Sequence, residues 1–486
     1  MKIPTYSNKE KTAILLLLSA NVMIFLTIWM RRQYDQIQFD QILFQLKSSS
    51  AGAQSALVGS AVVQVGVFAV AATILEICVY PRFAAFLKKR VLPLTIVILS
   101  ASGLFFTAQM GFYDYAWADS MKSEFIRAHY VKPDDAILHF PEQKRNLIYI
   151  FLESMESTFA DPSAGEPVTS CYIPELERLA EENLNFSHTD GLGGALSFPG
   201  TTWTAAAMVA QTSGVHIRVS LGADNYGAED VFLPGVTSLG QILEKQGYNQ
   251  TLLLGSDAEF NGRKAFFTEH GNYKILDTAA LKESGRLPDD YNEWWGFEDE
   301  KLFAYAREEL TRLAEEGEPF NFTMLTADTH FPDGYQCALC KEEYDAPYAN
   351  VLACSSRQLA AFVDWVREQP FYENTAIVIS GDHLTMDAAF MADIDPDYTR
   401  TVYDCFIHAA AEPAAEKNRQ FGTFDLFPTT LAALGVEIDG DRLGLGTNLF
   451  SDRKTLAEEY GYDALTEELQ KQSDFYDTEL LMEEAA

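Results

Sequence analysis

The chain has 486 residues and a formal net charge of −34. This length allows a sizeable core and more than one domain. The charge is uneven, because residues 1–112 hold ten Lys/Arg and four Asp/Glu, a net of +6, so the rest of the chain carries −40. A body this acidic argues against nucleic acid as a partner.

Three long apolar runs lie near the N-terminus, at residues 12–30, 55–80 and 91–110. Each is about long enough to cross a hydrocarbon core of ~30 Å. A cleaved signal peptide is the alternative for the first run, but Arg31-Arg32 follow it directly and no A-x-A-like site does. We therefore predict a membrane domain over residues 1–112 with three transmembrane helices.

Basic residues around these runs predict the orientation. The loop between the first two runs holds Arg31, Arg32 and Lys47, whereas seven basic residues precede the first run or separate the second from the third: Lys2, Lys9, Lys11, Arg82, Lys88, Lys89 and Arg90. The positive-inside rule puts the N-terminus in the cytoplasm. Three spans then place everything after residue 112 outside, so we expect a multi-pass cell-membrane protein with an extracytoplasmic domain.

The remaining chain is predicted to hold a juxtamembrane linker at 113–144, a catalytic domain at 145–455 and an acidic tail at 456–486. Apolar, β-rich runs predict buried strands at 145–154, 249–257, 320–330 and 374–383. Helical patterns alternate with them at 172–186, 236–247, 297–315 and 355–368. This alternation predicts an α/β fold whose mostly parallel sheet is covered by helices on both faces.

Ionisable residues follow several of these strands, where ligands bind in such sheets. Glu153 ends the first strand and would suit a hard metal ion, although a surface acid is the alternative. Asp382-His383 offer oxygen and imidazole donors that suit Zn²⁺ or Mn²⁺. His330 is a candidate phosphate partner or general acid, or else a loop-capping histidine.

The stretch "SFPGTTWTAAAMVA" crowds three threonines at the predicted start of a helix: Thr201, Thr202 and Thr204. A threonine hydroxyl can attack phosphorus if a metal ion lowers its pKa. A helix N-terminus adds free N–H groups for an oxyanion. Thr201 follows the Pro-Gly turn and is our candidate, whereas Thr204 is expected to pack. The alternative is that Thr201 or Thr202 caps the helix.

Six cysteines include one C-x-x-C, Cys337 and Cys340, with Cys354 further on. A zinc site usually needs two such pairs or histidines at matching spacing, and neither lies close by. For a domain outside the cytosol we therefore expect a local disulfide among these three cysteines. The pairing is left open, as is any part taken by Cys171 or Cys405.

Several stretches over residues 140–450, read in order, together resemble one family: "NLIYIFLES", "FPGTTWTAAAMVA", "GSDAEFNGRKAFF", "THFP", "ISGDHLTMD", "FDLFPTTLAALGV" and "DRLGLGTNLF". They are similar to the membrane phosphoglycerol transferases of the alkaline phosphatase/sulfatase superfamily. That family includes lipoteichoic acid synthase and the enzyme that decorates periplasmic glucans. The "GTTWTAAAMVA" and "GDRLGLGTNLF" stretches are most like the glucan-decorating subgroup.

The resemblance implies a metal site built from Glu153, Thr201, Asp382 and His383. It makes Thr201 the nucleophile as well. His330 matches a histidine that contacts the substrate phosphate, and Arg263 matches an arginine that binds the phosphoglycerol group. Lipoteichoic acid synthase has a tryptophan where this chain has Asn261, which leaves the packing against the head group open. It also has five spans against three here, so assembly of a long polymer is not implied.

The implied reaction transfers phosphoglycerol from phosphatidylglycerol, in the outer leaflet, to a glycan, glycolipid or glycerol phosphate acceptor. The family's mechanism passes through a phosphoglycerol-threonine intermediate and releases diacylglycerol. Its usual metal is Mn²⁺, and the ligand types would also accept Zn²⁺ or Mg²⁺. Trp203 and the pair Trp294-Trp295 are candidates to stack on a sugar or glycerol, with core packing or contact with the bilayer interface as the alternatives.

Three alternative functions remain to be weighed. A sulfatase needs C/S-x-P-x-R, and "SFPGT" has threonine in place of the arginine. A phosphoethanolamine transferase would share the threonine chemistry and differ in the head group of its product. A non-catalytic membrane sensor or scaffold predicts lost ligands, yet the implied metal and phosphate residues are all present.

Overall fold

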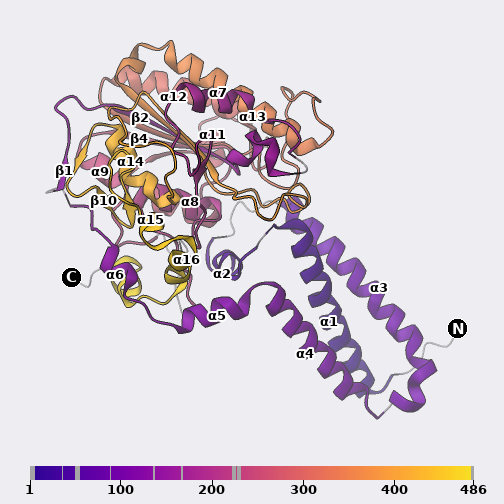
Figure 1. Cartoon of the computed structure of the whole chain (residues 1–486). Helices are drawn as coiled ribbons and strands as arrows, with labels where there is room; N and C mark the ends of the chain where they lie inside the picture. The colour runs from indigo at the N-terminus through magenta and orange to yellow at the C-terminus, as the bar shows by residue number, and fades with distance from the viewer. Residues whose placement is uncertain are drawn as a thin grey trace. The chain divides into compact units, whose positions relative to one another are not determined.

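The computed structural model describes residues 6–35, 37–49, 55–87, 89–134, 137–165, 168–221, 226 and 231–482 (Figure 1). Two of the basic residues used for orientation, Lys2 and Lys88, lie outside these ranges, as do residues 483–486 of the expected tail. The chain divides into two compact units. The smaller comprises residues 1–39 and 54–117, and the larger comprises residues 40–53 and 118–486.

The smaller unit is built from three long helices, α1 (Asn8–Gln33), α3 (Ser55–Leu87) and α4 (Val91–Gln109). A capping box starts α1, in which the Ser7 hydroxyl accepts from the backbone N–H of Glu10 and the Glu10 carboxylate accepts from the backbone N–H of Ser7. Each helix contains a stretch long and apolar enough to cross a membrane. The predicted spans therefore fall on real helices.

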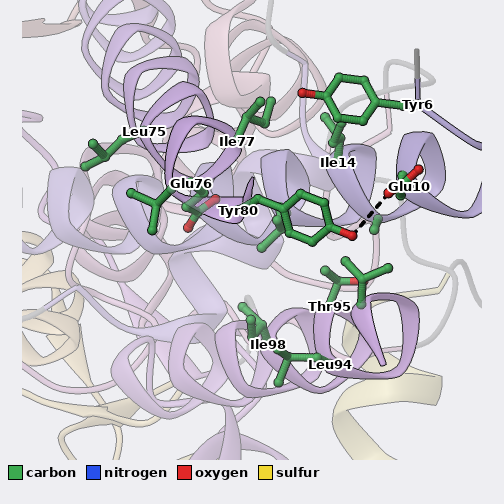
Figure 2. A pocket seen from close by; sticks show the side chains of 14 residues that line it. Tyr6, Glu10, Ile14, Leu75, Glu76, Ile77, Tyr80, Leu94, Thr95 and Ile98 are labelled. Carbon is green, nitrogen blue, oxygen red and sulfur yellow. Dashed lines mark hydrogen bonds between the residues drawn. The ribbon is translucent and has the colours of Figure 1, made fainter. Parts of the chain in front are cut away.

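Polar side chains connect these apolar helices. The Asn21 amide on α1 donates to Thr73 Oγ1 at 3.0 Å and to Glu76 Oε2 at 3.1 Å on α3. Tyr80 on α3 donates to Glu10 Oε1 at 3.1 Å, beside a mainly apolar cavity of about 390 Å³ that is lined by α1, α3 and α4 (Figure 2). Such bonds specify how helices pair where lipid and helix surfaces are equally apolar.

The larger unit is organised around a seven-stranded sheet. Five strands are parallel, β8 runs antiparallel to β7, and β3 runs antiparallel to β8. The prediction of a mostly parallel sheet is confirmed, while the antiparallel edge was not foreseen. In spatial order the strands are β3 (Gly194–Ala195), β8 (Val402–Ile407), β7 (Thr375–Gly381), β2 (Asn146–Leu152), β6 (Phe320–Leu325), β4 (Asn249–Leu254) and β5 (Lys274–Leu276).

Helices cover both faces of this sheet, as predicted (Figure 1). Residues along β2 alternate between two hydrophobic clusters, with Tyr149 in one and Ile150 in the other. The first cluster includes side chains of α8 (Thr204–Ser213), α9 (Leu239–Lys245), α10 (Arg263–Glu269) and α14 (Leu426–Ala433). The second includes α7 (Pro174–Glu182), α11 (Thr278–Glu283), α12 (Asp299–Glu316) and α13 (Pro347–Arg367).

Local sequence accounts for several element boundaries. Pro174 and Pro347 begin α7 and α13. The φ of proline suits a helix, and its missing N–H would have no partner within the helix at the first position. The start of α13 lies well before the predicted residue 355. Ser238 and Gln241 form a capping box at the start of α9. Prolines and capping residues thus mark helix boundaries in the sequence. Apolar periodicity alone placed the start of α13 too late.

The segment between the first two apolar helices forms α2 (Phe39–Lys47). Its residues from Asp40 onward belong to the larger unit. Phe44 is fully buried there, with ring centroids 5.0 Å from Trp203 and 5.3 Å from Tyr226. The Gln41 amide donates to the Thr202 hydroxyl at 2.7 Å. This loop is therefore an integral part of the larger unit.

Shorter elements complete the chain. Strand β1 (Leu138–His139) pairs with β9 (Glu437–Ile438), and β10 (Arg442–Leu443) pairs with β11 (Gly446–Thr447). The remaining helices are α5 (Phe112–Ser120), α6 (Phe125–His129), α15 (Leu456–Tyr460) and α16 (Tyr462–Gln470). Single turns occur at η2 (Ser157–Ala160), η3 (Pro162–Ala164), η4 (Phe260–Gly262), η5 (Pro370–Asn374), η6 (Thr423–Asp425) and η7 (Tyr476–Leu480).

Candidate active site

Three of the predicted ligands meet at the carboxyl edge of the sheet. Leu152 of β2 lies beside Gly381 of β7 in parallel register, so the next residues, Glu153 and Asp382, emerge side by side. One ligand atom from each of Glu153, Asp382 and His383 lies within 4.8 Å of the others. All three side chains are at most 3% exposed. Two carboxylates and an imidazole in this arrangement could hold a divalent metal ion.

Hydrogen bonds hold Asp382 and His383 so that one atom of each points into the cluster. Asp382 Oδ1 accepts from the backbone N–H groups of Ser154 and His383, both at 2.7 Å, while Oδ2 finds no donor among the described residues. His383 Nδ1 donates to the Leu384 carbonyl at 2.8 Å, which leaves Nε2 facing the carboxylates. Nε2 lies 3.4 Å from Asp382 Oδ2 and 3.7 Å from Glu153 Oε1. A buried orphan oxygen beside an imidazole nitrogen fits a metal ion.

The electrostatics of the cluster also favour a cation. Burial, reinforced by the Glu153 carboxylate, raises the pKa of Asp382 to about 7. Burial opposes protonation of His383, but Asp382 and Glu153 outweigh it and raise the His383 pKa. The site therefore holds protons that an isolated carboxyl and imidazole would release near neutral pH. A divalent cation can take their place.

The structure brings Thr204, rather than Thr201, to this cluster. Thr204 Oγ1 lies 3.3 Å from both Glu153 Oε2 and His383 Nε2. Thr201 instead closes a turn, because its hydroxyl donates to the Phe198 carbonyl at 2.9 Å and accepts from the Phe198 N–H at 3.2 Å. The expectation that Thr204 merely packs is therefore corrected.

Thr204 reaches the cluster, and Thr201 does not, because of the position at which α8 begins. "SFPGT" forms a turn with Gly200 at φ +74°, and α8 starts only at Thr204, with Trp203 as its N-cap. No side chain caps this helix, so its first N–H groups are available to an anion. Gln211, two turns along α8, accepts from the Tyr149 hydroxyl and donates to the Gly381 carbonyl. These bonds fix the start of α8 over the ends of β2 and β7.

Arg263 and His330 line one pocket together with Glu153 and Thr204. The Arg263 guanidinium donates to the Asp257 carbonyl at 2.7 Å and to Ser256 Oγ at 3.2 Å. Burial lowers the pKa of the guanidinium to about 10. This is still above neutral pH, so Arg263 stays cationic there. The predicted phosphate-binding residues therefore share a pocket with the predicted metal ligands.

His330 is held as a neutral imidazole. Its Nδ1 donates to the Phe331 carbonyl at 2.7 Å, so Nε2 is left as the acceptor. Burial lowers its pKa below the ordinary value, although the residue as a whole is only half-buried. A neutral ring with a free acceptor nitrogen can take a proton from a hydroxyl.

The family resemblance left open what packs against the head group, because this chain has Asn261 in place of a tryptophan. Asn261 is bound at its backbone N–H to the Ser49 carbonyl at 3.1 Å, and its side chain accepts from Ser48 at 3.1 Å. Trp295 supplies the aromatic surface instead, with its ring 4.6 Å from His330 and 5.5 Å from Phe260. It lines the pocket, which favours the stacking alternative over core packing.

Two carboxyl groups that the sequence did not single out hold the His330 loop. Asp299, at the start of α12, accepts from the backbone N–H groups of Ala327 at 2.7 Å and Asp328 at 3.2 Å. Asp328 Oδ1 accepts in turn from the N–H of Asp299 at 3.2 Å. Burial raises the pKa of both, and that of Asp299 reaches about 7. No motif marks such a pair, because its partners lie on separate segments.

Comparison with known proteins places these features among relatives. A family model described as Sulfatase matches residues 145–436. Phosphoglycerol transferase I of Escherichia coli is 31% identical over 332 residues, which are 67% of this chain and 41% of that protein. The chain thus matches less than half the length of these curated relatives.

Two solved structures share the fold. A protein of the alkaline phosphatase superfamily from Vibrio parahaemolyticus aligns with a TM-score of 0.52 and 20% identity, covering 69% of this chain and 79% of that one. The lipoteichoic acid synthase LtaP from Listeria monocytogenes aligns with a TM-score of 0.51 and 18% identity, covering 67% and 80%. These likenesses establish the architecture of the larger unit.

Proposed function

This chain belongs to the sulfatase family, and from that premise we propose that it transfers phosphoglycerol from phosphatidylglycerol to a cell-envelope acceptor. The similarity to phosphoglycerol transferase I supports the choice of donor. The acceptor is a glycan, a glycolipid or a glycerol phosphate chain outside the membrane. Thr204, and not Thr201, is the nucleophile in this proposal.

One observation carries the proposal. The Thr204 hydroxyl lies 3.3 Å from two side chains of the candidate metal cluster, and it stands at the uncapped N-terminus of α8. A nucleophile needs activation and a place for the developing negative charge, and this position offers both. The sulfatase alternative requires a cysteine or serine as the precursor of its nucleophile, whereas this position holds threonine.

Glu153, Asp382 and His383 would hold the divalent metal ion, which we propose is Mn²⁺, with Zn²⁺ and Mg²⁺ as alternatives. When bound, that ion lowers the pKa of the neighbouring Thr204 hydroxyl. Thr204 Oγ1 then attacks the phosphorus of phosphatidylglycerol, the bond to the lipid oxygen breaks, and diacylglycerol leaves with the proton that the threonine hydroxyl gives up. Arg263 neutralises the phosphate, and the first N–H groups of α8 face its oxygens.

The second half of the reaction regenerates the threonine. An acceptor hydroxyl attacks the phosphorus, and Nε2 of neutral His330 takes its proton. The bond from phosphorus to Thr204 Oγ1 breaks, His330 passes the proton on to that oxygen, and the phosphoglycerol stays on the acceptor. Trp295 packs against the glycerol part and keeps bulk water from competing.

The position of α2 supports the proposed topology. Helix α2 precedes α3 and α4 in the chain, yet Phe44 is buried within the larger unit that follows them. The loop and the catalytic domain must therefore lie on the same side of a membrane, as they do if α3 and α4 both cross it. The basic residues then favour a cytoplasmic N-terminus and an outer catalytic domain, where the lipid donor lies in the adjacent leaflet.

The test is to trap the intermediate. Purified full-length protein in detergent is incubated with Mn²⁺ and head-group-labelled phosphatidylglycerol without an acceptor, and the peptide spanning residues 197–210 is examined by mass spectrometry. We expect a phosphoglycerol adduct and free diacylglycerol with the wild type and the matched control Thr202→Ala, and neither with Thr204→Ala. An adduct that survives in Thr204→Ala would overturn the assignment. An adduct formed only from phosphatidylethanolamine would overturn the donor.

A further inference from the structure

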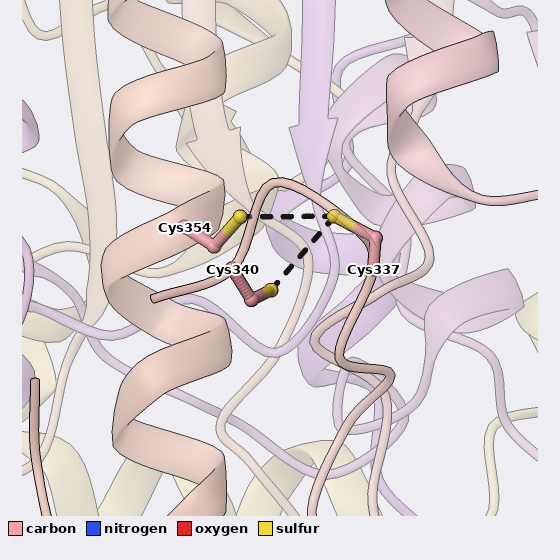
Figure 3. A group of neighbouring side chains, drawn as sticks. All are labelled: Cys337, Cys340 and Cys354. Atoms are coloured by element: carbon pink, nitrogen blue, oxygen red, sulfur yellow. Dashed lines mark hydrogen bonds between the residues drawn. The ribbon is translucent and has the colours of Figure 1, made fainter. Parts of the chain in front are cut away.

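Three cysteine side chains converge in the larger unit, apart from the candidate active site (Figure 3). Cys337 and Cys340 lie in the loop between β6 and α13, and Cys354 lies on α13. Cys337 Sγ is 3.8 Å from the sulfur of each of the other two, and all three sulfurs lie within 4.8 Å of one another. Cys337 and Cys354 are buried, while Cys340 is partly exposed.

These separations match a metal site better than a disulfide. A disulfide brings two sulfurs to about 2.05 Å and excludes the third. In a tetrahedral zinc site with Zn–S bonds of about 2.3 Å, neighbouring sulfurs are about 3.8 Å apart, the edge of the tetrahedron. Both sulfur–sulfur contacts of Cys337 have this length. The sequence-based expectation of a disulfide is not met, since the structure has all three as free thiols.

The side-chain amide of Gln358 lies near two of the three sulfurs. The Gln358 amide lies 3.8 Å from Cys337 Sγ, and the Cys340 N–H bonds to the Cys337 carbonyl at 3.1 Å, which closes the turn of the C-x-x-C. The Gln358 amide lies 3.5 Å from Cys354 Sγ. Donors aimed at sulfur stabilise thiolates, the form in which cysteine binds metal. The turn of the C-x-x-C thus presents its sulfurs ready for a cation.

We propose that Cys337, Cys340 and Cys354 bind one zinc ion through three thiolates. Each thiol releases its proton to solvent on binding, and no electron is transferred. No fourth Cys, His, Asp or Glu joins the group among the described residues. Water therefore completes the tetrahedron, on the side of partly exposed Cys340.

The site has a structural consequence for the same loop. His330 stands seven residues before Cys337, and the pair Asp299–Asp328 holds the first part of the loop. A zinc ion shared with Cys354 fixes the second part of the loop to α13. We infer that the ion maintains the geometry of the loop that carries His330. The metal-binding inference itself does not depend on the proposed transfer reaction.

Cobalt substitution tests the site without an activity assay. The full-length protein is purified in detergent with reductant, its metal is removed, and Co²⁺ is added. Thiolate ligands give intense near-ultraviolet charge-transfer absorption, which carboxylate and imidazole ligands at the other cluster do not. We expect this band in the wild type and in the matched control Cys171→Ser, and its loss in Cys354→Ser and Cys340→Ser.

Zinc content and thiol mapping complete the test. We expect the zinc content of protein purified with zinc to fall by about one ion per chain in Cys354→Ser and to stay unchanged in Cys171→Ser. Cys340 is the most exposed of the three cysteines, so Cys340→Ser should disturb folding least. Loss of zinc in this variant as well would show that the loss in Cys354→Ser is not caused by misfolding. Wild-type protein with no charge-transfer band would overturn the proposal. So would a non-reduced peptide map that joins Cys337 to Cys340 or Cys354 by a disulfide.

Discussion

The two ligand clusters of the larger unit are built in opposite ways. Glu153 and Asp382-His383 are more than two hundred residues apart and meet because β2 and β7 are neighbours in a parallel sheet. The three cysteines come from eighteen consecutive residues and meet through one loop and the helix after it. The first cluster has hard oxygen and imidazole donors, and the second has soft sulfur donors.

This difference teaches what each cluster can do. A site at strand ends is held by the sheet, so its ligands can face an open pocket without losing their positions. The cysteine cluster lies in a loop that no sheet holds in place. Its sulfurs face one another, so that a bound ion can hold the loop. The first arrangement suits chemistry on a substrate, and the second suits the fixing of a loop. The predictions below separate the two.

Removal of the nucleophile should have the largest effect. Thr204→Ala leaves the strand-end ligands in place but removes the hydroxyl, so we expect transfer to fall by at least about 10³-fold. Release of diacylglycerol from labelled phosphatidylglycerol measures it. Thr204→Ser should keep part of the activity. A Thr204→Ala protein with near wild-type rates would show that another group attacks.

Loss of a strand-end ligand should come next. Glu153→Gln removes a charge from the cluster, so we expect weaker binding of Mn²⁺ and transfer reduced by at least about 100-fold at low metal. Excess Mn²⁺ should restore part of the rate. The thiolate–cobalt band should be unchanged in this variant. Its loss there would mean that the two clusters are not independent.

The thiol cluster should affect stability more than chemistry. Cys354→Ser removes the zinc that joins the loop to α13, so we expect the melting temperature to fall by several degrees. Activity should drop less than in Thr204→Ala, because the catalytic side chains remain. Differential scanning fluorimetry with Cys171→Ser as control measures it. Equal melting temperatures in zinc-loaded wild type and Cys354→Ser would contradict a structural role.

Helix α2 offers a matched pair of substitutions. Phe44→Ala removes a fully buried ring that packs on Trp203, the N-cap of α8, and should cost about 3 kcal/mol in stability. Leu46→Ala on the same helix, where the side chain is 78% exposed, should change little. Denaturation of the larger unit and the transfer rate are both measured. Equal effects of the two changes would argue against the docking of α2.

The smallest expected effect concerns pH. Burial keeps the pKa of His330 below the ordinary value of a histidine. The base should therefore stay neutral as pH falls through that ordinary value, and activity should be lost only at lower pH. Trp295→Ala exposes the ring and should move that loss to higher pH, by less than about one unit. The profile of kcat/KM at saturating Mn²⁺ measures it. A shift to lower pH would contradict the role of burial.

The sequence by itself determined the features that local patterns control. Uninterrupted apolar runs marked the three membrane-length helices and the central strands, because burial on both faces demands such runs. Glu153, Asp382 and His383 were found because polar residues at the ends of parallel strands meet at one edge. His330 was found in the same way, and the family motifs added Arg263, which the structure puts in the same pocket.

Tertiary structure decided the rest. Three threonines lie within four residues and the sequence favoured Thr201, but the turn closed by Thr201 on Phe198 carries Thr204 to the candidate metal cluster instead. The sequence grouped Cys354 with the C-x-x-C only as a possible disulfide partner, because the turn that brings all three sulfurs together depends on how the loop folds against α13. Local patterns report which side chains are buried, whereas the direction of a hydroxyl or a thiol depends on backbone turns that the packing of distant segments fixes.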